Sequence, residues 1–155
     1  MITAVDTNIL FDIILPDEPH GDASEVSLAN ALSAGAVVIS DPVYAEVSSR
    51  FPDRNDLNRV LEDTGIRRDA PGERSLHRAG IAFAAYLQRR PLGFTCQQCG
   101  SLQTLTCRRC STGVRSRQHV LTDFLIGAHA AVQADRLLTR DRGYYGTYFP
   151  ELTLS

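Results

Sequence analysis

The sequence contains no lysine and no tryptophan, and it has a single methionine among 155 residues. All 16 basic residues are therefore arginines, whose planar guanidinium groups favour bidentate contacts to phosphate or carboxylate. A GC-rich codon bias would produce the same composition and is the simpler explanation. The chain also lacks an apolar run long enough to span a bilayer, and its start, MITAVDTNIL, lacks the features of a signal peptide. We therefore expect a cytoplasmic protein that does not associate with membranes.

Cysteine is scarce, and its four copies all lie between residues 96 and 110. Basic residues are scarce in the first part of the chain, and acidic residues are scarce in the part that follows. Residues 1 to 66 carry twelve acids and three arginines, whereas residues 67 to 117 carry ten arginines and two acids. An apolar fraction of 43% and a charged fraction of 22% are ordinary for a soluble globular protein. At this length, residues 1 to 155 are expected to form one domain.

Short apolar runs alternate with segments of helical periodicity. Strands are predicted at residues 3–6, 36–40, 65–68 and 136–139, because these runs are short and bounded by turn or helix signals. Helices are predicted at residues 7–15, 22–34, 40–51, 56–65, 73–90 and 119–135. We expect Val26, Leu28 and Leu32 to face inward in the second helix, and Leu76, Ala79 or Gly80, Phe83 and Leu87 to do so in the fifth. This alternation predicts an α/β sandwich with a mainly parallel central sheet flanked by helices.

Residues 91–117 interrupt the alternation and read as an insertion between two helices. The insertion contains Cys96, Cys99, Cys107 and Cys110, spaced as two C-x-x-C pairs seven residues apart. Two such pairs can supply four thiolates to one tetrahedral Zn²⁺, and a closed shell of four sulfurs is usually structural. Two disulfides and a redox C-x-x-C site are the alternatives, and a cytoplasmic location disfavours the disulfides. We therefore predict a small zinc-knuckle insertion.

Four arginines flank these cysteines, namely Arg108, Arg109, Arg115 and Arg117. They are candidates for binding the backbone phosphates of RNA, which supply most affinity that is independent of base sequence. They would equally serve to balance the charge of a zinc site with four thiolates, or to contact an acidic protein partner. The sequence leaves these roles open.

Four acids occupy positions where a carboxylate is awkward for folding. Asp6 ends the first predicted strand and Asp141 follows the last one, whereas Glu46 and Asp123 lie near the starts of predicted helices. Ligands of open parallel sheets bind beyond the carboxyl ends of the strands, so three of these acids are expected near one rim from topology alone. We also expect Gly127, one turn after Asp123, to leave space beside that carboxylate. Clustered half-buried carboxylates are costly unless a cation joins them, which favours a divalent metal.

Each acid also has a purely structural interpretation. Asp6 would cap the helix that follows it, and Asp123 would stabilise a helix N-terminus electrostatically. Asp141 would hold a turn, and Glu46 would be a solvated helix residue. The functional interpretation gains weight from the order and context in which the four occur.

The segments AVDTNILFD, SDPVYAEVSSRF, LTDFLIGAHA and LLTRDRGYY resemble, in this order, the four acidic motifs of PIN-domain ribonucleases, and most closely those of VapC toxins. The resemblance implies a PIN-like sandwich in which the four acids bind catalytic Mg²⁺ or Mn²⁺, with Asn8 and Thr139 supporting them. It also implies an RNA substrate such as transfer or ribosomal RNA, a cognate antitoxin and a homodimer. The cysteine insertion departs from the compact toxins.

Two other functions remain open from the sequence. The chain could be a catalytically inactive PIN-like scaffold whose zinc knuckle binds RNA or protein. A DNA nuclease of the flap-endonuclease type has a similar active site in outline, but this chain is too short for the duplex-binding elements of such enzymes. The intact set of acids favours the endoribonuclease.

Overall fold

A parallel sheet forms the centre of the molecule in the computed structural model, which describes residues 1–16, 18–89, 92–96, 98–114 and 120–155. Its four strands in this part of the chain are β1 (Ile2–Val5), β2 (Ala36–Ile39), β3 (Arg67–Arg68) and β8 (Arg136–Leu138), in the order β3-β2-β1-β8. Every neighbouring pair is parallel. The predicted α/β class and mainly parallel sheet are confirmed.

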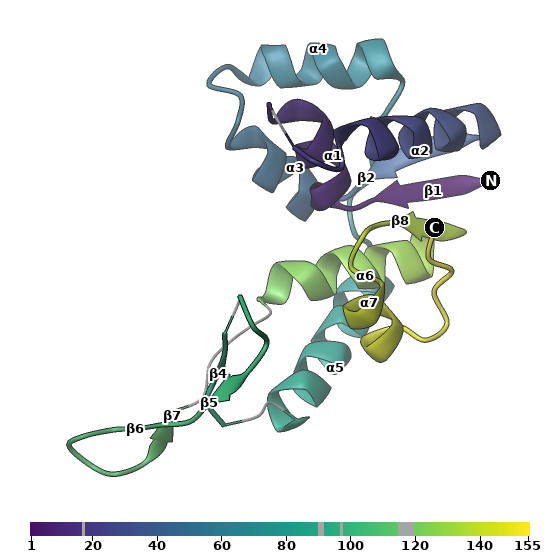
Figure 1. Cartoon of the computed structure of the whole chain (residues 1–155). Helices are drawn as coiled ribbons and strands as arrows, with labels where there is room; N and C mark the ends of the chain where they lie inside the picture. The colour runs from purple at the N-terminus through teal and green to yellow at the C-terminus, as the bar shows by residue number, and fades with distance from the viewer. Residues whose placement is uncertain (17, 90–91, 97, 115–119) are drawn as a thin grey trace.

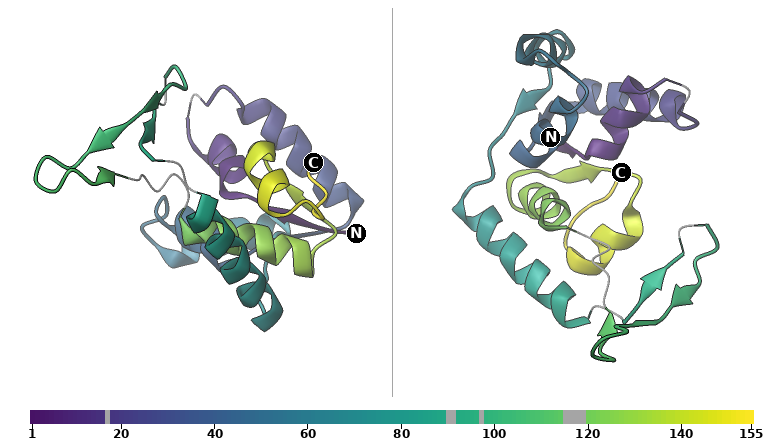
Figure 2. Two further views of the ribbon diagram at one scale, coloured as in Figure 1. Left: turned by 90° about the horizontal axis from the view of Figure 1, so that it is seen from below. Right: turned by 90° about the vertical axis from the view of Figure 1, so that its left-hand side faces the viewer.

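Helices cover both faces of this sheet (Figures 1 and 2). On one face lie α1 (Thr7–Ile14), α2 (Gly21–Ala34), α3 (Asp41–Ser48) and α4 (Arg54–Thr64). On the other lie α5 (Glu73–Arg89), α6 (Leu121–Gln133) and α7 (Arg142–Tyr148), of which α7 had no sequence prediction. The last residues of the chain extend the β8 edge, where Leu137 forms a parallel bridge with Leu154.

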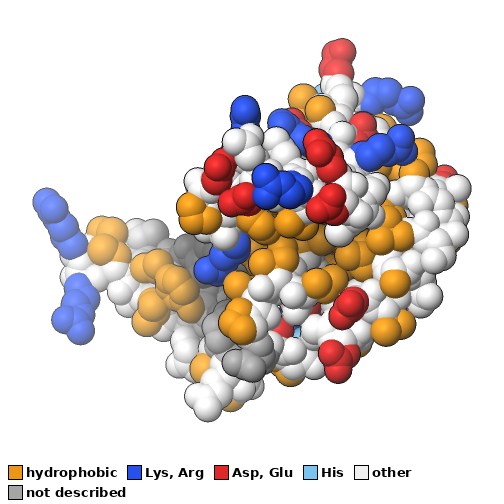
Figure 3. Space-filling model, turned by 90° about the horizontal axis from the view of Figure 1, so that it is seen from above, with side chains coloured by type: hydrophobic (Ala, Val, Ile, Leu, Met, Phe, Trp, Pro, Cys, Tyr) orange, Lys and Arg blue, Asp and Glu red, His pale blue; other side chains and the backbone are white. Residues whose placement is uncertain are grey.

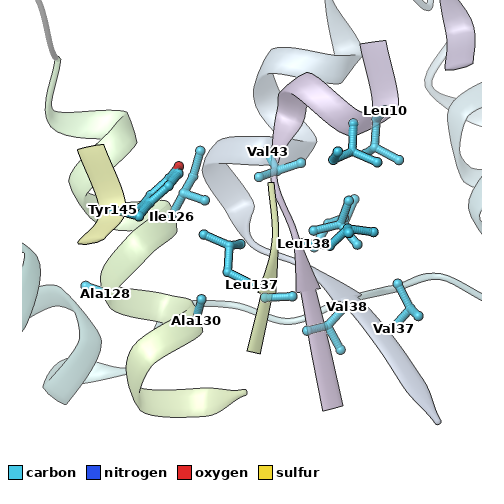
Figure 4. Close-up of a cluster of buried hydrophobic side chains, with 14 of the residues drawn as sticks. Leu10, Val37, Val38, Val43, Ile126, Ala128, Ala130, Leu137, Leu138 and Tyr145 are labelled. Atoms are coloured by element: carbon cyan, nitrogen blue, oxygen red, sulfur yellow. The ribbon is translucent and has the colours of Figure 1, made fainter. Parts of the chain in front are cut away.

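The core lies on both sides of the sheet (Figure 4). Val37 and Leu137 in the strands are fully buried, Val43 packs from α3, and Ala128 and Ala130 pack from α6. Short, continuous apolar runs are expected for strands whose two faces are both covered by helices. Removal of this apolar surface from water is the main force that holds the helices against the sheet, and backbone hydrogen bonds fix the register of its strands.

The predicted inward stripe of α5 is confirmed at Ala79, which is fully buried, and is wrong at its two leucines. Leu76 and Leu87 are 51% and 38% exposed, and the buried residues of the helix are Ser75, Ala79, Ala82 and Tyr86. The buried face consists mainly of small residues because α5 packs closely along α6. The apolar periodicity is dominated by large side chains. It therefore indicated a helix face that lies beside the buried one. Val26 of α2 is also exposed rather than inward, whereas Leu28 is buried.

Residues of the insertion form two small antiparallel hairpins that project from the body (Figures 1 and 2). The first pairs β4 (Phe94–Thr95) with β5 (Leu102–Gln103), and the second pairs β6 (Leu105–Thr106) with β7 (Gly113–Val114). Their shared base needs a glycine at position 93, since a Cβ there would lie 2.2 Å from the Gln103 carbonyl oxygen. Across the ranges described above, we find no helix whose length and apolar character suit a membrane span.

Candidate active site

The carboxyl ends of β1 and β8 create one rim of the sheet. Val5 is paired with Leu138, so the residues that follow these strands, Asp6 and Thr139, lie side by side. Asp6 is also the N-cap of α1, and its Oδ1 accepts a hydrogen bond of 2.7 Å from the Thr7 amide. The capping interpretation of Asp6 therefore describes part of what this residue does.

The Asp6 carboxylate is held by the two residues that the sequence proposed as its supports. Its Oδ2 accepts one hydrogen bond of 2.7 Å from Asn8 Nδ2 and another of 2.7 Å from Thr139 Oγ1. Asn8 Nδ2 also lies 3.2 Å from Thr139 Oγ1. These hydrogen bonds fix the orientation of the Asp6 carboxylate. Asp6 is only 6% exposed.

Burial raises the pKa of Asp6 to about 6, the largest effect being loss of hydration. Hydrogen bonds from Thr139, Thr7 and Tyr145 act in the opposite direction, and the negative charge of Asp123 raises the pKa further. A carboxylate that is costly to ionise and faces a second carboxylate gains free energy when a cation approaches. The geometry therefore favours a cation at this rim.

Two of the other three acids are tied to the same rim by hydrogen bonds. The Thr7 hydroxyl donates to Glu46 Oε2, which joins the start of α1 to α3. Asp141 donates its backbone N–H to Thr139 Oγ1 at 3.0 Å, and its Oδ1 accepts from the Tyr144 amide at 3.1 Å. Asp141 thus caps α7 as well, in line with its structural interpretation.

Asp123 lies in the first turn of α6 and is close enough for its charge to act on Asp6. Its Oδ2 accepts a hydrogen bond of 3.0 Å from the Val120 amide, which precedes the helix. Its charge raises the pKa values of Asp6, Tyr144 and Tyr145, after the larger effect of their burial. The expected space beside Asp123 is not provided by Gly127, because a Cβ there would lie 2.4 Å from the Phe149 ring. Gly127 instead admits this aromatic ring of the core.

The donor set of the rim suits a hard divalent cation, since all four acids offer oxygen ligands. Within the described ranges, however, no three His, Cys, Asp or Glu side chains converge closely enough to ligate one ion. Mg²⁺ is usually bound by only one or two carboxylates and keeps several water ligands. The residues present therefore fit a hydrated ion held mainly by Asp6 and its neighbours, and they do not form a dry cage.

Two features of the site were missed by sequence reasoning. Tyr145, on α7, donates a hydrogen bond to the Asp6 carboxylate from a buried position. Asp12, on α1, is 3% exposed and forms a bidentate ion pair with Arg140, at 2.7 Å to Nε and 2.8 Å to a terminal nitrogen. Ser24 Oγ also donates to Asp12 at 2.7 Å. The acid inside the apolar run ILFDII was the available signal for this pair.

The predicted zinc residues lie far from the acidic rim, at the tips of the two hairpins of the insertion. Cys96 and Cys99 share the first tip, and Cys107 and Cys110 share the second. The tips point in different directions, so the four sulfurs do not meet (Figures 1 and 2). Two of the flanking arginines, Arg108 and Arg109, are exposed at the second tip, whereas Arg115 and Arg117 lie outside the described residues.

Comparison with known proteins places the fold among the VapC toxins. No protein-family model and no curated protein sequence matches the chain. VapBC2 from Rickettsia felis, solved bound to a DNA fragment from its promoter, matches with a TM-score of 0.60 and 18% identity, covering 100% of this chain and 98% of that chain. VapBC-1 from nontypeable Haemophilus influenzae matches with a TM-score of 0.61 and 18% identity, covering 100% and 97%.

A third solved structure is VapC20 from Mycobacterium tuberculosis, a toxin that cleaves the sarcin-ricin loop. It matches with a TM-score of 0.52 and 12% identity, covering 97% of this chain and 98% of that chain. At these identities the likeness concerns the fold. The chain therefore has the PIN-like fold of VapC-type proteins.

Proposed function

We propose that this protein is a metal-dependent endoribonuclease and the toxin of a VapBC-type toxin-antitoxin pair. The observation that carries the proposal is the buried Asp6 carboxylate, with a raised pKa, held by Asn8 and Thr139 at the rim of a VapC-type sheet. A residue that serves only as a helix cap needs neither this burial nor a second carboxylate nearby. A fold alone does not establish an activity, so the proposal rests on the site.

The catalytic metal residues in this proposal are Asp6, Glu46, Asp123 and Asp141. When bound, Mg²⁺ or Mn²⁺ polarises the scissile phosphate and lowers the pKa of a water ligand. Asp6 anchors the cation in a fixed direction because Asn8, Thr139 and Tyr145 hold its carboxylate. Asp123 adds negative charge from α6, while Glu46 and Asp141 border the site from α3 and from the residues after β8.

The proposed substrate is RNA, with transfer and ribosomal RNA as the first candidates, and the proposed partner is a cognate antitoxin. Two neighbours of similar fold are VapBC complexes, and a third cleaves the sarcin-ricin loop. A homodimer is a further part of the proposal. Leu76, Ile81 and Leu87 on α5 are exposed apolar residues available to such a contact.

Cleavage of total RNA by the purified protein tests this function. The wild type should give discrete fragments with Mg²⁺ or Mn²⁺ and none with EDTA, while Asp6→Asn should give none in either condition. Asp56→Asn, an exposed acid on α4, is the matched control and should cleave like the wild type. If wild type and Asp6→Asn both bind RNA and neither cleaves it with divalent cations, the inactive scaffold that binds RNA or protein through its insertion is correct instead.

A further inference from the structure

The two hairpin tips of the insertion have the same local backbone structure. In the first tip, the Cys96 amide donates to the Ser101 carbonyl and the Gly100 amide donates to the Cys96 carbonyl, both at 2.9 Å. In the second tip, the Cys107 amide donates to Thr112 and the Ser111 amide donates to Cys107, both at 2.8 Å. The same two bonds therefore close both C-x-x-C loops, although the sequences between the cysteines differ.

The similarity extends to the residue that follows each pair. Gly100 has a φ of 72° and Ser111 a φ of 59°, and Ser111 is the one non-glycine residue with positive φ in the described ranges. A serine is rarely found in this left-handed region, because its Cβ lies too close to the backbone there. Each second cysteine also contacts a hydroxyl two residues later, Cys99 with Ser101 at 3.1 Å and Cys110 with Thr112 at 3.4 Å. Two unrelated sequences thus adopt one loop geometry around paired sulfurs.

All four sulfurs are free thiols at or near the surface. Cys96 and Cys107 are partly buried, and Cys99 and Cys110 are exposed. Each loop supplies two ligands, which is half of the tetrahedral shell that Zn²⁺ adopts in structural sites. Oxygen-binding cations such as Mg²⁺ do not select thiolates, so this site is chemically distinct from the acidic rim.

The hairpins share one base, which leaves them tethered close to one another. The Gly93 amide donates to the Val114 carbonyl at 2.8 Å and thereby joins the start of the insertion to its end. Only Thr104 separates β5 from β6, so a change in its backbone angles turns one hairpin relative to the other. This rotation keeps the hydrogen bonds within each hairpin, and it requires the Gly93–Val114 hydrogen bond between the hairpins to open.

The insertion has little apolar interior of its own, which gives a metal a structural role. Phe94, Leu102 and Leu105 are each at least 38% exposed. The space-filling view shows hydrophobic side chains along the projecting insertion and basic side chains at its far end (Figure 3). Small elements that cannot bury a core are commonly stabilised by a metal ion, whose binding free energy then contributes to folding.

We propose that the insertion binds one Zn²⁺ per chain through Cys96, Cys99, Cys107 and Cys110, with rotation at Thr104 joining the two half-sites. Each thiol loses its proton on binding, so four thiolates and one Zn²⁺ carry a net charge of −2. Arg108 and Arg109, which lie between the second pair of cysteines, offset this charge. The closed shell leaves no position for substrate, so the ion orders the insertion and takes no part in RNA cleavage.

The test is the zinc content of the full chain, purified with a reductant and dialysed, together with the visible spectrum after exchange into Co²⁺. We expect one zinc per monomer, four thiols protected from alkylation, and the spectrum of tetrahedral Co²⁺ with four thiolates. Cys99→Ser and Cys110→Ser alter different hairpins, and each alone should reduce zinc content at least tenfold. Gln98→Ser, a change at the same tip that removes no ligand, should retain full zinc, as should Asp6→Asn.

Three results would overturn the proposal. Two disulfides and no zinc in the wild type would show that the cysteines form covalent cross-links. Loss of only half of the zinc in each cysteine variant would show two independent sites. One zinc per two chains in a dimer would show that the half-sites of two copies share an ion. Because zinc is measured separately from RNA cleavage, failure here leaves the proposed nuclease function untouched.

Discussion

At the scale of single residues, the site is organised around Asp6, a carboxylate that the fold makes costly to ionise. Asp6 is the clearest case, because its burial raises its pKa from 3.8 to about 6. The folded protein therefore binds this proton more tightly than the unfolded chain does. Between pH 3.8 and about 6, stability falls as pH rises, and above this range the folded state carries the full cost of the charge. That cost is about 3 kcal/mol for a shift of this size.

Asp6→Asn should therefore stabilise the metal-free protein at pH 7.5, by about 1–3 kcal/mol, because it removes a buried charge. The gain should largely disappear at pH 4, where the wild-type carboxyl is protonated. Urea unfolding in EDTA at the two pH values measures both free energies, with Asp56→Asn as the exposed control. A variant less stable than the wild type at pH 7.5 would contradict the assigned cost.

The Asp12–Arg140 ion pair gives a second prediction at this scale. Arg140→Ala leaves the 3% exposed Asp12 carboxylate with Ser24 as its remaining side-chain partner, and should cost about 3–5 kcal/mol. Asp12→Asn leaves no buried charge, because Arg140 is 44% exposed and its guanidinium can turn toward water. The expected loss of stability is therefore smaller, about 1–2 kcal/mol. Urea unfolding of both variants compares the two losses. Equal losses would mean that desolvation of Asp12 is unimportant.

At the scale of secondary-structure elements, α6 connects the acidic rim to the core. It carries Asp123 at its start, packs along α5 on one side and contacts β1 and β8 on the other. Phe124 of this helix is fully buried and packs edge-to-face with Phe83 and Tyr144. The position of Asp123 thus depends on aromatic packing around α6 and on the close approach of Phe149 at Gly127.

Gly127→Ala should destabilise the protein, by about 1–3 kcal/mol, because the added methyl group overlaps the Phe149 ring in a filled core. Gly80→Ala in α5 is the matched control, since no atom lies within 4 Å of its added Cβ. That change should stabilise the helix by about 0.5–1 kcal/mol. Thermal unfolding of both variants checks the opposite signs, and a stabilising Gly127→Ala would refute the packing described here.

The elements also show what a sequence can and cannot predict. Strands β1, β2 and β8 were predictable because short apolar runs are buried on both faces of the sheet. The buried face of α5 was predicted only in part, since close helix packing buries Ser75 and Ala82 and leaves Leu76 and Leu87 exposed. Tyr145 was missed for a related reason, because nothing in the run RGYYGTY indicates which tyrosine faces a carboxylate. Contacts between distant elements decide such details.

At the scale of the whole molecule, two chemically different sets of ligands are kept apart. The proposed oxygen ligands lie at the sheet rim, and the proposed sulfur ligands lie on hairpins that project from the body (Figure 1). The position of Asp6 followed from sequence because parallel strands end at one rim, whereas Asn8 and Thr139 were expected beside it only from the resemblance to PIN-domain ribonucleases. The separation of the two cysteine pairs could not be predicted from the sequence. The spacing brings the cysteines of each pair together, but it does not determine the angle between the two hairpins at Thr104.

Metal-dependent cleavage at the acidic rim is the central claim, and a titration tests it most directly. The measurement is the initial rate of cleavage of total RNA against Mn²⁺ concentration at pH 7.5, for the wild type and Asp6→Asn. The rate should rise to saturation in the wild type and fall at least a hundredfold in the variant at every concentration. Equal rates in the two proteins, or a wild-type rate unchanged by Mn²⁺ and by EDTA, would contradict the account.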